Sequence, residues 1–210
     1  MARLLGADPA DLLRTPVGAA LRDILPVAAL SGMRVEEIAQ LRVRDAAEGT
    51  FAIRQAKSRA GVRQVPIHPA LAPLVAERCR GKEPGAFLFH ELTEGAFGKR
   101  SAALVKAFGR FAKKVGVREE VEGKRRSLVN FHSFRRWFVT KAHQAGQPVH
   151  LVEAVVGHKP VGMTLGRYSG GPSLGTSSGR WWKAWRCRGC PLGTPFGSAT
   201  GAGTAPGGIY

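Results

Sequence analysis

Cysteine is scarce in this sequence, and its scarcity argues against two kinds of protein. The chain has 210 residues and three cysteines, Cys79, Cys187 and Cys190. An odd and small number of cysteines argues against a disulfide framework. Cys187 and Cys190 form a lone CxxC pair, whereas a zinc site needs about four ligands and no second pair exists. We therefore expect no metal ion and no cofactor.

Long apolar runs are also missing. No stretch reaches the length of a membrane-spanning helix. The N-terminal segment carries Asp8 and Asp11 and lacks the apolar core of a signal peptide. The sequence therefore predicts a cytoplasmic protein without a membrane partner.

Acidic residues are few, and the last of them is Glu153. The chain has 15 Asp and Glu against 32 Lys and Arg, a net charge of +17. Four of the basic residues lie in a glycine-rich tail, and removing them still leaves 32 − 4 = 28 bases against 15 acids. This balance favours a polyanionic partner, nucleic acid first, over a surface that is merely basic.

Apolar periodicity predicts a mainly α fold with one small antiparallel β-sheet (α+β). The expected helices cover residues 17–30 (kinked near Pro26), 34–45, 69–80, 97–117, 132–145 and 148–156, and a short one ends at Tyr168. Two β-prone runs in residues 50–67 predict a hairpin. Residues 1–172 would form one domain, and residues 173–210, which have low complexity, a disordered tail.

The segment HSFRRWF, which begins at His132, combines a packing stripe with polar groups. Phe134, Trp137 and Phe138 follow the i, i+3, i+4 spacing of a core-facing helix. His132 and Arg135 are three residues apart, so they share another face and point outward together. Both donate hydrogen bonds and arginine is always charged, so this face is suited to an anion.

Other polar residues lie beside turns and helix starts. Arg34 follows SGM, Lys57 lies in the hairpin turn, His158 follows Gly157, and Tyr168 comes ten residues later. Tyrosine can act as a covalent nucleophile, arginines can clamp a phosphate, and lysine and histidine can move protons. The set fits phosphoryl transfer without a metal. Each residue alone also has an ordinary structural explanation, such as a cap, a turn or a core plug.

The segments around these residues resemble the catalytic domain of the tyrosine recombinases, or phage-type integrases. LSGMRVEEIAQL resembles the first arginine box of that family and matches Arg34 to the first catalytic arginine. HSFRRWFVTKAHQAG resembles its His-x-x-Arg box, with His132 and Arg135. The resemblance runs from about residue 20 to residue 170.

Two further segments carry the same resemblance. RQAKSRAGVRQVPI resembles the hairpin that bears the family's catalytic lysine, here Lys57. LVEAVVGHKPVGMTLGRY resembles the Gly-His box and the nucleophile, here His158 and Tyr168. Four such boxes in the family's order are far more specific than any one of them.

The resemblance implies an enzyme that breaks and rejoins DNA through a 3′-phosphotyrosyl link to Tyr168. Arg34 and Arg135 would stabilise the transition state. His132 would accept the tyrosine proton, Lys57 would protonate the leaving 5′ oxygen, and His158 would bind the phosphate.

The implied partners are double-stranded DNA, contacted by residues 97–117 and 118–130, and further copies of the chain in a tetramer. A core-binding domain usually precedes this domain in the family, and because only about 20 residues precede the first matching helix we expect a catalytic domain alone. Two other interpretations stay open: an inactive remnant that only binds DNA, and an enzyme like a type IB topoisomerase.

Overall fold

The fold is helical with one small sheet, as the sequence predicts. The structure, a computed structural model, describes residues 1–54, 61–118 and 127–158. Its α-helices are α1 (Ala2–Gly6), α2 (Pro9–Leu13), α3 (Pro16–Ser31), α4 (Val35–Ala39), α5 (Ala72–Cys79), α6 (Ser101–Lys114), α7 (His132–Gln144) and α8 (Val149–Val156). Within the described ranges, no helix is both long and apolar enough to cross a membrane.

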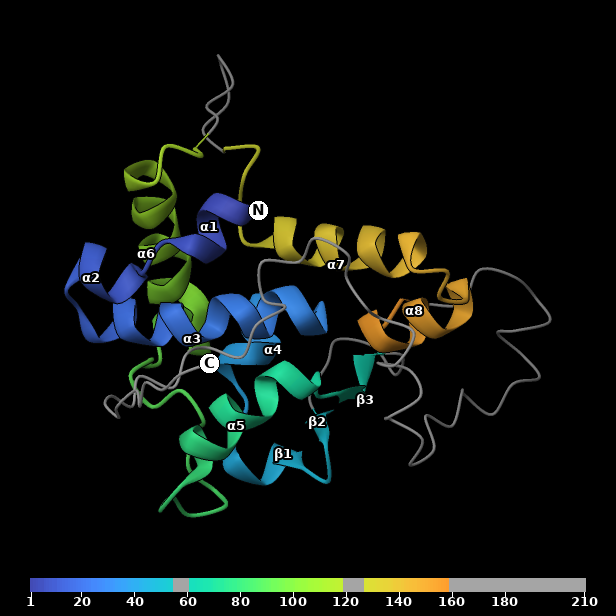
Figure 1. Cartoon of the computed structure of the whole chain (residues 1–210). Coiled ribbons are helices and arrows are strands. Elements are labelled where there is room, and N and C mark those ends of the chain that lie inside the picture. Colours follow the sequence, from blue (N-terminus) through green and yellow to red (C-terminus); the bar gives the residue numbers. More distant parts are fainter. Residues whose placement is uncertain (55–60, 119–126, 159–210) are drawn as a thin grey trace, which may run out of the picture.

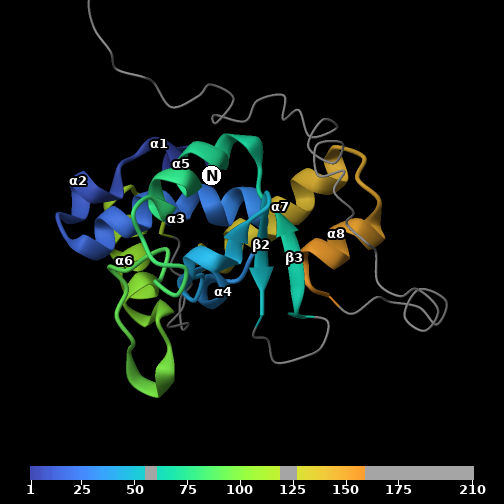
Figure 2. The same cartoon turned by 90° about the horizontal axis from the view of Figure 1, so that it is seen from below.

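The sheet contains the predicted hairpin and one strand more. Its strands, in the order β1-β2-β3, are β1 (Ala46–Ala47), β2 (Thr50–Ile53) and β3 (Arg63–Pro66), all antiparallel. Phe51 pairs with Val65, and both are buried. Figure 2 shows β2 and β3 side by side with α8 next to β3. The turn that joins β2 to β3 lies outside the described residues.

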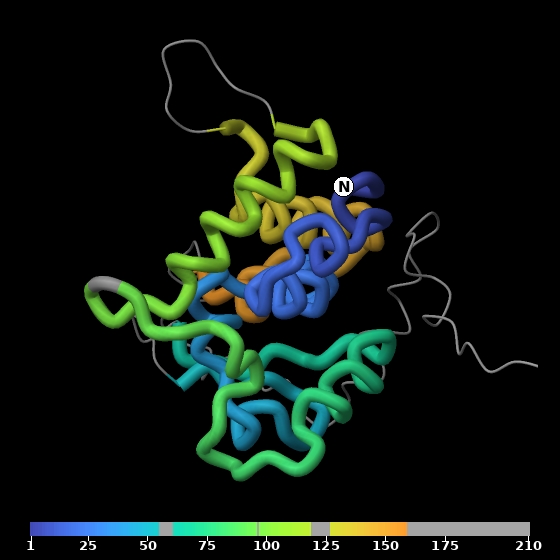
Figure 3. Tube along the Cα trace, turned by 90° about the vertical axis from the view of Figure 1, so that its left-hand side faces the viewer, coloured from blue at the N-terminus to red at the C-terminus, as the bar shows by residue number. Residues whose placement is uncertain are grey.

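Helix α3 is the central element. Thr15 caps its start by accepting a hydrogen bond from the Gly18 N–H (3.1 Å), and Gly32 ends it in the left-handed conformation. The helix continues through Pro26. Helices α2, α6 and α7 pack against it, and in Figure 3 the segment from β1 to α5 forms a separate layer below these helices.

The aromatic stripe of α7 packs into the core as expected. Phe134 and Phe138 are buried, and Trp137 is half-buried against the same core. Phe134 also contacts two other phenylalanine rings, those of Phe108 and Phe131, at centroid distances of 5.8 and 5.5 Å. These ring contacts join α7 to α6 and fix where the polar face of α7 lies.

The helix expected over residues 34–45 is wrong in its second half. Helix α4 ends at Ala39, because the backbone then pairs with a distant segment: the Leu88 N–H donates to the Leu41 carbonyl (2.8 Å), and Arg42 forms an isolated bridge with Phe87. The chain then enters β1. This non-local pairing has no signal in the local sequence.

The helix expected over residues 97–117 is shorter at both ends. Phe97 and Gly98 have positive φ values of 63° and 69°, which an α-helix does not allow, so α6 begins at Ser101. Glu36 of α4 caps this start by accepting from the N–H groups of Arg100 (3.1 Å) and Ser101 (3.0 Å). Helices α1 and α2, which apolar periodicity did not predict, precede α3 in the chain (Figure 1), and α2 packs against α3.

Candidate functional site

The candidate site begins at the turn between α3 and α4. Arg34 is the residue before α4, in an extended conformation, and its side chain is 46% exposed. Glu37 accepts two hydrogen bonds from Arg34, one from its backbone N–H (2.8 Å, to Oε2) and one from Nη1 (2.8 Å, to Oε1). The guanidinium is thereby held by one of its five N–H groups, and four are left for a ligand.

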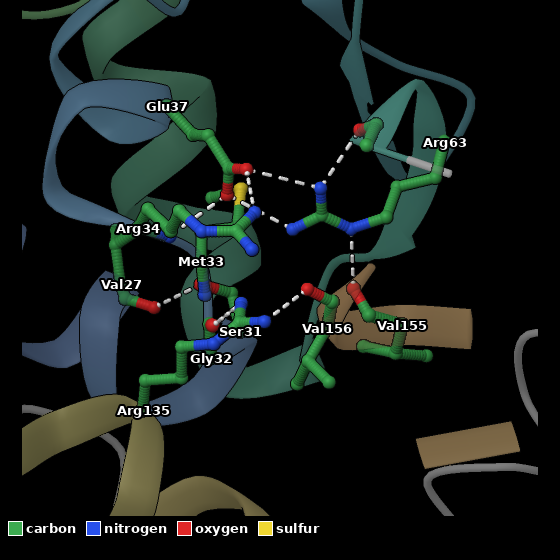
Figure 4. A network of polar contacts seen from close by, with 11 residues as sticks. Val27, Ser31, Gly32, Met33, Arg34, Glu37, Arg63, Arg135, Val155 and Val156 are labelled. Atoms are coloured by element: carbon green, nitrogen blue, oxygen red, sulfur yellow. Dashed lines mark hydrogen bonds and ion pairs between the residues drawn. The ribbon is translucent and has the colours of Figure 1, made fainter. Parts of the chain in front are cut away.

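Arg135, on α7, contacts the same turn, but its side chain is buried. It is 3% exposed, so the expectation that its side chain points outward is wrong. Its Nη1 donates to the carbonyl of Gly32 (2.9 Å), and its Nη2 donates to the carbonyl of Val156 at the end of α8 (Figure 4). Three N–H groups of this buried guanidinium remain in addition to those two bonds.

Gly32 makes this approach possible. Its φ of +63° favours glycine, and a Cβ at this position would lie 2.5 Å from Cδ1 of the Phe138 ring. Arg135 and Phe138 are three residues apart on α7, so both reach Gly32, one its carbonyl and the other its Cα. Gly32 therefore contacts both the core, at the Phe138 ring, and the candidate site, at the Arg135 guanidinium.

Positive charge exceeds negative charge at this point. Two arginines, Arg34 and Arg63, donate to one carboxylate, Glu37, and a third, Arg135, donates to the nearby carbonyls of Gly32 and Val156 (Figure 4). Burial and then the charges of Arg34 and Arg63 lower the pKa of Arg135 to about 10, although Glu37 acts in the opposite direction. Arg135 is still charged at neutral pH, and the excess positive charge makes this a place where an anion would be stabilised.

The Glu37 carboxylate is ionised despite its environment. Burial raises its pKa, but hydrogen bonds from Arg63 and Arg34 outweigh burial, so the net pKa is lowered. Its side chain is 8% exposed. Glu37 was not among the predicted site residues; the signal for it in the sequence was its position on α4, three residues after Arg34 at the N-cap.

His132 lies at the exposed start of α7. Asn130 caps this helix by accepting a hydrogen bond from the His132 N–H (3.0 Å) through its side chain. Burial, then the charges of Arg135, Arg136 and Arg34, lower the pKa of His132. The imidazole is therefore neutral at pH 7 and able to accept a proton.

His158 follows the end of α8 at the surface. Gly157 adopts a φ of +68°, and the His158 N–H donates to the carbonyl of Glu153 (2.9 Å), which closes the turn. Burial, then the charges of Arg135 and Arg34, lower the pKa of His158. The charges of the same two arginines therefore act on both histidines.

Two of the six predicted site residues lie outside the described residues. These are Lys57 and Tyr168, and the Cys187 and Cys190 pair lies outside them too. In the part of the chain that the structure describes, no group of three or more His, Cys, Asp or Glu side chains could hold a metal ion.

The chain matches the phage integrase family over residues 3–170. No curated protein sequence matches it.

Three solved structures have similar folds. XerA recombinase is 21% identical, with 89% of this chain and 61% of that chain covered and a TM-score of 0.51. The Tn1549 transposon integrase in complex with transposon right end DNA is 18% identical, covers 85% and 61%, and has a TM-score of 0.58. The XerH site-specific recombinase bound to difH substrate is 20% identical, covers 78% and 47%, and has a TM-score of 0.50.

The fold is that of the catalytic domain of tyrosine recombinases. The chain belongs to the phage integrase family, which matches most of its length. At these identities the solved structures establish the fold alone, and the chain spans 61% of the length of the XerA and Tn1549 chains.

Proposed function

We propose that this chain breaks and rejoins double-stranded DNA by transesterification. The Tyr168 oxygen would attack a backbone phosphorus, and the bond from phosphorus to the 5′ oxygen would break. The products would be a 3′-phosphotyrosyl link and a free 5′ hydroxyl. The link keeps the energy of the phosphodiester bond, and attack by a 5′ hydroxyl would reverse the reaction, so no energy source is required.

The arginines would stabilise the transition state. Attack creates a phosphorane with extra negative charge on its non-bridging oxygens. Arg34 and Arg135 would donate to these oxygens, and both are already held by Glu37, Gly32 and Val156. Such preorganised donors are each worth about 3–4 kcal/mol in comparable oxyanion sites.

The remaining side chains would move protons or bind the phosphate. His132, neutral because its pKa is lowered, would accept the proton of Tyr168. Lys57 would give a proton to the leaving 5′ oxygen, and His158 would hydrogen-bond the phosphate. None of these steps calls for a metal ion.

The charge imbalance around Glu37 is the observation that carries the proposal. An isolated excess of buried positive charge is unfavourable in a free protein, because burial and mutual repulsion oppose it. A phosphate in contact with Arg34 and Arg135 would offset that repulsion. Membership of the phage integrase family supports a DNA phosphate as this anion.

The partners follow from the same proposal. Double-stranded DNA would contact the exposed basic side of α6, which includes Lys106, Arg110 and Lys113. Further copies of the chain would assemble on DNA, as a tetramer. The Tn1549 integrase, which has a similar fold, was solved in complex with transposon right end DNA, and this supports DNA as the partner proposed for this chain.

Covalent trapping tests the proposal. The substrate is a pool of nicked duplexes with a randomised central sequence, so that a short 5′-hydroxyl product diffuses away and the adduct persists. Protein concentration is high and salt low, because DNA contacts weaken with salt. We expect an adduct that survives denaturation with the wild-type chain and none with Tyr168→Phe, which removes only the hydroxyl.

Two outcomes favour the other interpretations. Intact DNA binding without an adduct under any condition would indicate a remnant that only binds DNA. Relaxation of supercoiled plasmid by a single subunit would indicate topoisomerase chemistry. Equal adduct formation by Tyr168→Phe would rule out Tyr168 as the nucleophile.

A further inference from the structure

Arg63, at the start of β3, is buried and hydrogen-bonded within the protein, unlike an ordinary surface arginine of a hairpin. Its side chain is 6% exposed. It donates hydrogen bonds to three separate segments: Nε to the Val155 carbonyl (2.6 Å), Nη1 to the Gly61 carbonyl (2.8 Å) and to Glu37 Oε1 (3.1 Å), and Nη2 to Glu37 Oε2 (2.9 Å). This one guanidinium therefore joins β3, α4 and α8.

The first connection reaches Arg34. Glu37 receives both nitrogens of the Arg63 fork, and its same two oxygens accept from the Arg34 side chain and backbone (Figure 4). A carboxylate held by a bidentate arginine has a fixed plane and a fixed position. Arg63 therefore fixes the group that orients Arg34, which is itself 46% exposed and otherwise free to turn.

The second connection reaches the end of α8. The last carbonyls of a helix have no partner within the helix and attract cations. Here the Val155 carbonyl accepts from Arg63, and the next one, of Val156, accepts from Arg135. Gly157 and His158 follow at once, so these two arginines determine where the His158 turn lies.

We propose that Arg63 is a positioning residue for phosphate binding, which sets Arg34 and His158 relative to each other without touching the DNA. This inference rests on the proposed function, because it assumes that both groups bind one phosphate. Arg63 forms four hydrogen bonds within the protein and is buried, so it can hold Glu37 and the end of α8 in place but is not exposed to DNA.

Two substitutions and a matched control separate positioning from folding. Arg63→Lys keeps the charge but cannot span both Glu37 oxygens and the Val155 carbonyl. Arg63→Gln removes the charge as well. Arg54→Gln is the control: Arg54 comes from the end of β2 in the same hairpin and pairs with Asp45, but its side chain is 60% exposed and it contacts neither Glu37 nor α8.

The first readout is independent of DNA cleavage. Inorganic phosphate is titrated into each protein while the ring protons of His132 and His158 are followed by NMR. We expect both Arg63 variants to bind phosphate about tenfold more weakly than the Arg54→Gln control, as is typical when an outer-shell partner of a ligand-binding group is lost. Lysine should not rescue the effect, because the fork is lost in both variants.

The second readout uses the nicked duplexes that the wild-type chain captures. We expect adduct formation by Arg63→Lys to slow by about a hundredfold, because small displacements of aligned groups have effects of that size. Affinity for duplex DNA should match that of the control. A role limited to folding would instead lower adduct yield in proportion to the folded fraction, with the rate of the folded protein unchanged.

Every outcome decides the matter. Equal phosphate binding and equal adduct rates in Arg63→Lys and Arg54→Gln overturn the proposal, and so does failure of both Arg63 variants to fold, which makes the residue structural. If the wild-type chain binds phosphate but forms no adduct, the proposed function fails and the phosphate titration alone judges Arg63. If it binds no phosphate at the two histidines, there is nothing for Arg63 to position and the inference is wrong.

Discussion

Substituting Gly32 by alanine tests the geometry at the centre of the site. Gly32 combines two demands, a positive φ and contact with the Phe138 ring. An alanine there is strained by its backbone conformation, and its Cβ would lie 2.5, 2.8 and 3.1 Å from three atoms of that ring. Phe138 is fully buried, so the ring cannot move aside freely.

The expected loss of stability is the sum of two effects. A left-handed conformation costs a non-glycine residue about 1–2 kcal/mol. Overpacking a well-filled core adds about 1–3 kcal/mol, because ordinary carbon contacts are near 3.5–4.0 Å. We therefore expect Gly32→Ala to lower the free energy of unfolding by about 2–5 kcal/mol.

Urea denaturation with a matched glycine measures the two effects separately. Gly49 also has a positive φ, +72°, but nothing lies within 4 Å of an added Cβ, so Gly49→Ala should show the backbone effect alone. Adding Phe138→Leu to Gly32→Ala should give a favourable coupling energy, since the clashing ring is gone. If Gly32→Ala is no more destabilising than Gly49→Ala, the contact with Phe138 is not as described.

Three further predictions concern charge. Glu37→Gln should destabilise the protein by about 3–5 kcal/mol at neutral pH, because it leaves the buried Arg63 without its carboxylate partner; since the pKa of Glu37 is lowered from 4.5, the wild-type advantage should be present above that pH and be lost as pH falls below it. His132 and His158 should titrate below 6.5 in NMR pH titrations of the free protein, and inorganic phosphate should raise both pKa values, so phosphate affinity should increase as pH falls through that range; an unchanged pKa would contradict a shared anion site. Glu36→Ala should cost about 1 kcal/mol in urea denaturation through loss of the α6 cap; a normal stability would show that water replaces this carboxylate.

Local patterns predicted most of the fold, and they failed where contacts are distant in sequence. The hairpin at residues 50–67 and the helices at 132–145 and 148–156 follow from apolar periodicity and turn residues, and the structure confirms them. Strand β1 has two residues, Ala46 and Ala47, too few for a periodic signal, and α4 ends at Ala39 although a helix was expected as far as residue 45. The reason is that residues 41–43 pair with residues 86–88, which no local propensity encodes.

The candidate site shows the same limit. The types and order of Arg34, His132, Arg135 and His158 were visible in the sequence, and in the structure the charges of Arg34 and Arg135 act on both histidines. Their catalytic roles, like those of Lys57 and Tyr168, stay predictions. The ion pair between Glu37 and Arg63, which holds Arg34, could not be predicted from the sequence, because these two residues are 26 positions apart and are brought together by the fold.

Burial of Arg135 explains why stability and chemistry are linked in this domain. A helical face that carries an arginine would ordinarily be turned to solvent, since burying a guanidinium without a carboxylate partner is unfavourable. Here the Phe138 ring, one turn along α7, lies against Gly32, and Arg135 on the same helix donates to the Gly32 and Val156 carbonyls. The guanidinium position is therefore set by core packing rather than by a surface salt bridge. A core substitution in α7 should consequently displace Arg135 and impair phosphate binding even where the protein still folds.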